Sequence, residues 1–238
     1  GKAQSAFSDI KGMGNTRYSD ALIGAYFQKF FLYNDLWMEL DYHRNNYRFY
    51  GLNYLDSSNN ELFDADSLFG QHYNFFDAHV KFNSRNVGRD TNKLRYRTWL
   101  DVHHLNSNYQ LNENHVLIGA HSGWLILSEE FLGTLEIDIN NLSQPEMFLD
   151  SNEIIQVADN NNQTSAIVRF NPHIYTRKNN LMAKLGVSIQ ADINDVAKFH
   201  FFPDVEVSYS LFNNVFIPYG GLKGNVQRNT FNSVRMEN

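Results

Sequence analysis

Long stretches of this chain alternate between apolar and polar residues with a period of two. From Leu181 to Ile193, the odd positions are apolar and most even positions are polar. Successive side chains of a β-strand point to opposite faces, so such a stretch folds as a strand with one apolar and one polar face. Helical periodicity is rare by comparison. The alternation therefore predicts an all-β protein.

The alternation recurs in about ten segments, several of them separated by clusters of asparagine, a residue that favours turns. The expected strands lie near residues 21–33, 36–50, 74–84, 93–105, 114–126, 131–141, 165–176, 181–193, 198–211 and 215–227. Most are ten to thirteen residues long, about twice the length of an ordinary strand. We therefore predict an up-and-down antiparallel β domain over residues 21–238, preceded by a lead-in segment over residues 1–20.

The length of these strands and the connections between them favour a transmembrane barrel. A tilted strand of about 9–11 residues crosses the hydrocarbon core of a bilayer. Short connections follow the strands near 21–33, 114–126, 165–176 and 198–211, whereas residues 51–73 and 142–164 form long ones. Tight turns at one end and larger loops at the other are typical of outer-membrane barrels.

Aromatic residues collect near the short connections, as in the girdles at a membrane–water boundary. These residues are Phe31, Tyr33, Trp37, Trp124, Phe131, Tyr175, Tyr209, Phe212 and Phe216. Tyrosine and phenylalanine are also common in strands of every kind. The aromatic positions therefore support the membrane interpretation without requiring it.

The composition excludes several other classes. A net charge of −6 argues against a nucleic-acid partner, because phosphate binding needs a surplus of lysine and arginine. The absence of cysteine excludes disulfides, thiolate metal sites and a cysteine nucleophile. A mean hydropathy of −0.46 and the lack of a long apolar run exclude a helical membrane protein.

The same net charge and mean hydropathy fit a soluble antiparallel β-sandwich or barrel, in which the apolar face forms the core and the polar face meets water. Such a protein would be a β-rich binding module for a carbohydrate or protein ligand. Exposed Trp37, Trp99 and Trp124 would then contact the ligand. This alternative stays open at the level of the sequence.

Four short segments resemble the barrel region of Gram-negative outer-membrane proteins of the TonB-dependent-receptor-like and porin-like kinds. They are residues 201–209 (FFPDVEVSY), 216–224 (FIPYGGLKG), 40–43 (LDYH) and 49–51 (FYG). The resemblance implies a transmembrane up-and-down β-barrel in the cell outer membrane, in contact with lipid, whose polar lumen passes or takes up small solutes. The sequence does not specify the solute, nor a surface lipoprotein or energising partner.

The chain departs from that family in two ways. We find no plug domain, which a TonB-dependent receptor needs, and no terminal strand ending in an aromatic residue. Both departures lead us to expect a fragment of a longer barrel.

In the barrel interpretation the polar faces of the strands line a hydrated lumen. The candidate lumen-lining residues are Glu39, Asp41, His43, Asp77, His79, Lys81, Arg95, Arg97, Asp101, His103, Lys184, Glu206 and Lys223. Selectivity filters concentrate charge of one sign, so this mixture predicts a polar passage without strong ion selectivity.

Three Asp-x-His triplets place a carboxylate and an imidazole on the same strand face, about 6–7 Å apart. They are Asp41-Tyr42-His43, Asp77-Ala78-His79 and Asp101-Val102-His103. If the strands near 74–84 and 93–105 pair, the last two triplets form one cluster. That cluster could be a weak metal site or a pH-sensitive patch, or a set of mutually satisfied charges. We predict no resident metal and no cofactor, and, because no serine is singled out as a nucleophile, no enzyme.

Overall fold

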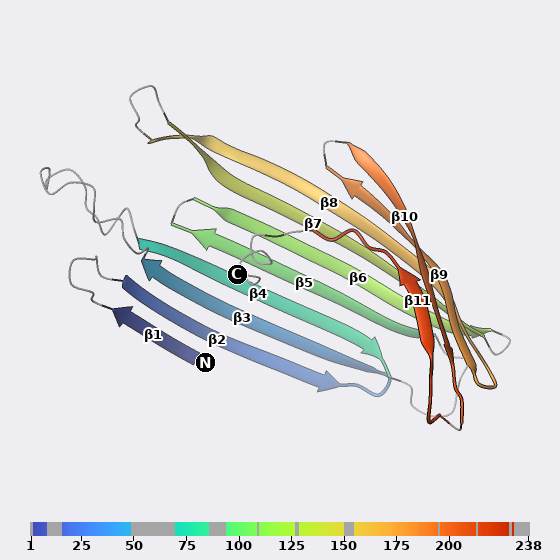
Figure 1. Ribbon diagram of the computed structural model, residues 1–238. Helices are drawn as coiled ribbons and strands as arrows, with labels where there is room; N and C mark the ends of the chain where they lie inside the picture. The colour runs from blue at the N-terminus through green and yellow to red at the C-terminus, as the bar shows by residue number, and fades with distance from the viewer. Residues whose placement is uncertain are drawn as a thin grey trace, which may run out of the picture.

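A computed structural model describes residues 2–8, 16–48, 70–85, 94–108, 110–126, 129–149, 155–194, 196–212, 214–228 and 230. These residues form one antiparallel sheet of eleven strands, arranged in chain order so that each strand pairs with the next (Figure 1). The strands are β1 (Lys2–Ser8), β2 (Thr16–Phe30), β3 (Asn34–Arg48), β4 (Gly70–Ser84), β5 (Arg95–Ser107), β6 (Asn112–Ile126), β7 (Glu129–Leu149), β8 (Ile155–Lys178), β9 (Leu181–Ile193), β10 (Ala197–Tyr209) and β11 (Tyr219–Lys223). The predicted all-β, up-and-down antiparallel arrangement is confirmed.

The sheet is curved and open. Strands β9 to β11 turn away from the plane of β2 to β7, and the edge strands β1 and β11 lie apart (Figure 1). Among the described residues, β1 pairs only with β2 and β11 only with β10. No helix in this part of the chain is long and apolar enough to cross a membrane.

One expected long connection is instead a hairpin. Residues 142–164 were expected to form a loop, but β7 and β8 are 21 and 24 residues long and continue their pairing through most of that segment. Ser143 lies opposite Asn162, and the register shifts between Pro145 and Met147. The prediction was wrong because it relied on apolar alternation. A ladder of backbone hydrogen bonds does not need apolar side chains, and this hairpin is polar and rich in asparagine.

The two ends of the sheet also differ from expectation. Residues 1–20, assigned above to a lead-in segment, contain β1 and the beginning of β2. The small and polar side chains of β1 give little alternation. The final strand, expected over 215–227, is limited to Tyr219–Lys223. Pro218 has no backbone N–H for a ladder, and Leu211 and Phe216 form a separate bridge around the preceding turn.

The two faces of the sheet show an inverted pattern of burial. On the apolar face, the side chains of Ile118, Leu135 and Leu185 are 48%, 44% and 53% exposed. On the polar face, Asp138 and Gln190 are only 5% and 1% exposed. The sheet thus buries several of its charged and amide side chains and leaves much of its aliphatic surface uncovered by any described residue.

The polar face is the concave one, because the sheet curves towards the side on which the segment after β11 lies (Figure 1). A pocket of about 500 Å³ on this face is lined by residues of β6 to β9 together with Lys223 of β11 and the segment that follows it. One small apolar cluster, Tyr73, Phe75 and Leu105, interrupts the polar face towards the long-connection end of β4 and β5. The concave face therefore holds the polar side chains that a functional site would use.

Candidate functional site

All thirteen candidate lumen residues lie on the polar face. Directly opposite residues of an antiparallel pair share a face, and the register joins the candidates into one set. Opposed pairs are Glu39–His79, Asp41–Asp77, Asp77–His103, His79–Asp101, Arg97–His121, Lys184–Glu206 and Lys223–Asp204. His43, Lys81 and Arg95 stand at alternate positions beside these residues.

The Asp-x-His residues of β4 and β5 do form one cluster, but the partners are exchanged between strands. His79 Nδ1 lies 2.8 Å from Asp101 Oδ1, and His103 contacts Asp77 in the same way. Opposed residues have Cβ atoms about 4.5–5.5 Å apart, closer than residues two apart on one strand. Each acid therefore pairs across the ladder rather than within its own triplet.

The first triplet also pairs with a neighbouring strand, but diagonally, since His43 lies opposite Leu22 and Asp20 lies opposite Asn45. His43 pairs with Asp20 of β2, a residue that the sequence analysis did not single out, rather than with Asp41. Gly24 lies opposite Asp41, and a methyl group at Gly24 would overlap the Asp41 carboxylate. The missing side chain on β2 leaves room for the carboxylate on β3.

Among the residues that the structure describes, no group of three or more His, Asp and Glu side chains is arranged to hold a metal ion. The weak metal site considered from the sequence has no support in this geometry. The arrangement is that of paired acids and imidazoles along β3, β4 and β5.

Asp138 is the centre of a second cluster, which the sequence analysis missed. His115 Nε2 lies 3.0 Å from its Oδ1, and Arg169 Nη2 lies 3.3 Å from its Oδ2. Arg228 Nη1 lies 3.5 Å from Oδ1. The alternation of Glu136, Asp138 and Asn140 could have marked the polar face of β7. No local pattern connects Arg228 to it, because this arginine lies beyond the last strand.

The segment after β11 lies against the polar face. Gln190 Nε2 donates to Asn225 Oδ1 at 2.9 Å, and the backbone N–H of Val226 donates to Gln190 Oε1 at 2.9 Å. Arg228 Nη1 also donates to the carbonyl oxygen of Ser165 at 3.0 Å. Figure 1 shows this segment, in red, running from β11 across β7 and β8. The segment therefore covers part of the concave face where β7, β8 and β9 lie.

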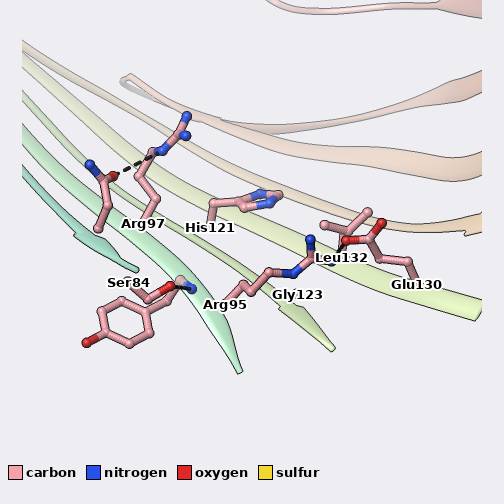
Figure 2. A pocket seen from close by; sticks show the side chains of 9 residues that line it. Ser84, Arg95, Arg97, His121, Gly123, Glu130 and Leu132 are labelled. Atoms are coloured by element: carbon pink, nitrogen blue, oxygen red, sulfur yellow. Dashed lines mark hydrogen bonds and ion pairs between the residues drawn. The ribbon is translucent and has the colours of Figure 1, made fainter. Parts of the chain in front are cut away.

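A third group of polar side chains surrounds a pocket of about 380 Å³ near the tight-turn end of β5, β6 and β7. Figure 2 shows Arg97 rising from β5 beside His121 of β6, with Arg95 turned towards Glu130 of β7. Arg95 and Glu130 form an ion pair. Arg97 Nε donates to Asn83 Oδ1 at 3.1 Å, and His121 Nδ1 lies 2.9 Å from Thr134 Oγ1.

Seven of the nine aromatic residues expected at a girdle are exposed, with exposures from 37% for Phe131 to 77% for Phe212. Trp37 and Tyr175 are exceptions, because their positions in the alternation place them on the polar face. Lys81 Nζ lies 4.6 Å from the centre of the Trp37 ring, and the Tyr175 hydroxyl lies 3.7 Å from Met182 Sδ. Their proximity to a turn correctly predicted that they lie near the ends of the strands. It did not predict that they lie on the polar face.

No protein-family model matches this chain, and no curated protein is significantly similar to it.

Proposed function

We propose that this chain forms the wall of an outer-membrane β-barrel, porin-like or TonB-dependent-receptor-like, whose polar face lines a passage for small polar solutes. The observation that carries the proposal is the inverted burial. Ile118, Leu135 and Leu185 form part of an exposed apolar face, while Asp138 and Gln190 are buried on the other face.

This pattern is the reverse of a soluble sandwich, in which a second layer covers the apolar face. Full exposure of an aliphatic side chain to water costs about 1.5–3 kcal/mol relative to its burial, and these side chains, about half exposed, would each cost roughly half of that if the face met water. Contact with lipid removes this cost. A membrane barrel places apolar side chains outward and polar side chains inward, which accounts for both faces at once.

The proposal also requires that the backbone groups at the edges of β1 and β11 be paired. Unpaired N–H and C=O groups are too costly in hydrocarbon, so only closed sheets span a bilayer. The two edges would pair with each other or with further strands.

The three tryptophans test the proposal, because they divide between the two faces. Trp124 lies opposite Phe131 on the apolar face, whereas Trp99 lies opposite Lys81 on the polar face. Single-tryptophan variants retain either Trp124 (W37F/W99F) or Trp99 (W37F/W124F). Each is folded into vesicles whose acyl chains carry bromine, a short-range quencher of fluorescence.

We expect strong quenching of Trp124 and weak quenching of Trp99. Equal quenching of the two, or refolding to a monomer in detergent-free buffer with no insertion, would overturn the proposal. The second outcome would instead support the soluble binding module.

A further inference from the structure

Four cations of the polar face are paired with a neighbouring carboxylate. Lys184 Nζ lies 2.7 Å from Asp204 Oδ2, Arg169 and Arg228 share Asp138, and Arg95 pairs with Glu130. Arg97 differs. Within the described part of the chain, no carboxylate lies at ion-pair distance from its guanidinium, which is held only through Nε by the neutral Asn83 side chain.

The unpaired guanidinium borders the pocket of about 380 Å³ described above. The charged side chains lining that pocket are Arg95, Arg97 and Glu130, so its formal charge is +1 in a protein whose net charge is −6. Gly123 lies opposite Arg95 and gives the pocket a floor without a side chain. The space above β5 and β6 is therefore open to a small group of negative charge.

His121 supplies a second donor. It lies directly opposite Arg97, and its Nδ1 contacts the Thr134 hydroxyl. His121 lines the pocket, and in the tautomer in which Nδ1 accepts the Thr134 proton, its Nε2 carries a hydrogen that can donate to a ligand. A guanidinium presents two parallel N–H donors that match the oxygens of a carboxylate or phosphate.

We propose that Arg97 and His121 form a binding site for the oxyanion group, carboxylate or phosphate, of a small solute. Arg97 holds two oxygens through its Nη groups, His121 donates to one of them, and the Arg95–Glu130 pair closes the side towards β7. This inference deepens the proposed function and rests on it for the route by which a solute reaches the polar face.

Trp99 reports on the site, because it lies two residues from Arg97 on the same face and thus about 6–7 Å away along β5. The full chain carrying only Trp99 (W37F/W124F) is folded in detergent micelles. It is titrated with sodium phosphate and, separately, with sodium acetate, at an ionic strength held constant with sodium chloride. Either anion should give a saturable fluorescence change, and their relative affinities distinguish a phosphate from a carboxylate group.

Arg97→Gln should weaken binding of the preferred anion at least about tenfold. Arg97→Lys, which keeps the charge but loses the fork, should weaken it to a smaller extent. Arg44→Gln is the matched control, since Arg44 lies on the apolar face opposite Ala21. The Arg44→Gln variant should bind the anion with the same affinity as the parent protein. Circular dichroism confirms that each variant is folded, and Arg97→Lys decides the matter if Arg97→Gln does not fold.

A change that never saturates, or an equal loss of affinity in the Arg44 and Arg97 variants, would overturn the site. The bromine-quenching experiment tests the proposed membrane wall independently of anion binding. Saturable binding without quenching of Trp124 would retain the site and reject the membrane wall. Quenching of Trp124 without saturable anion binding would retain the membrane wall and reject the site.

Discussion

Arg228 Nη1 lies 3.5 Å from Asp138 Oδ1, so the segment beyond the last strand is tied by an ion pair to the middle of the sheet. Asp138 is 5% exposed and is also in contact with His115 and Arg169. The buried Asp138 carboxylate therefore offsets the positive charge of two neighbouring guanidinium groups and contacts an imidazole.

Asp138→Asn should therefore destabilise the protein by about 3 kcal/mol, because it leaves Arg169 and Arg228 partly buried without their shared charge. The free energy of unfolding is measured with urea in detergent micelles. Asp192→Asn is the control, since Asp192 stands on the same face and no ion pair involving it is found among the described residues; it should change stability by less than about 0.5 kcal/mol. Equal effects of the two substitutions would contradict the role given to Asp138.

The acid–imidazole pairs of β4 and β5 should be coupled across the ladder and not along the strand. A double-mutant cycle on Asp77 and His103 should give a coupling of about 0.5–1 kcal/mol, because the two side chains are in contact. The matched cycle on Asp101 and His103 should give a coupling close to zero. The reverse order would mean that the triplets pair within each strand, as their spacing alone suggests.

Gly119 should be intolerant of a side chain. A methyl group there would overlap the indole of Trp99, which covers this glycine on the polar face. Gly119→Ala should cost about 1–3 kcal/mol through overpacking, measured as a lower urea midpoint. Gly133→Ala is the control, since a Cβ atom at Gly133 meets nothing within 4 Å, and should leave the midpoint unchanged.

Charge on the apolar face should be costly in lipid in a manner that depends on depth. Leu185→Arg, within β9, should cost about 2–4 kcal/mol on folding into vesicles. Leu181→Arg, at the tight-turn end of the same strand, should cost only about 0–1 kcal/mol. If neither substitution affects folding, the apolar face meets water and not lipid. An arginine would then be tolerated at position 185, where the leucine side chain is already 53% exposed.

The period of two was sufficient to predict the strands near residues 93–105 and 181–193, where the structure has β5 and β9, and to sort their residues between two faces. It also placed Asp77, His79, Asp101 and His103 on one face, because the alternation of side chains is a local property of extended backbone. It failed where side chains carry no alternation, as in β1 and the polar hairpin of β7 and β8.

The sequence by itself determined the class of fold and the composition of each face. Only the tertiary structure decided the partners: His103 with Asp77, His43 with Asp20, and Arg228 with Asp138. It also decided that side chains such as Asp138 and Gln190 are buried on the polar face. The reason is physical. Alternation fixes which residues share a face, whereas register, curvature and the return of the chain end depend on pairing between distant segments, which no local pattern encodes.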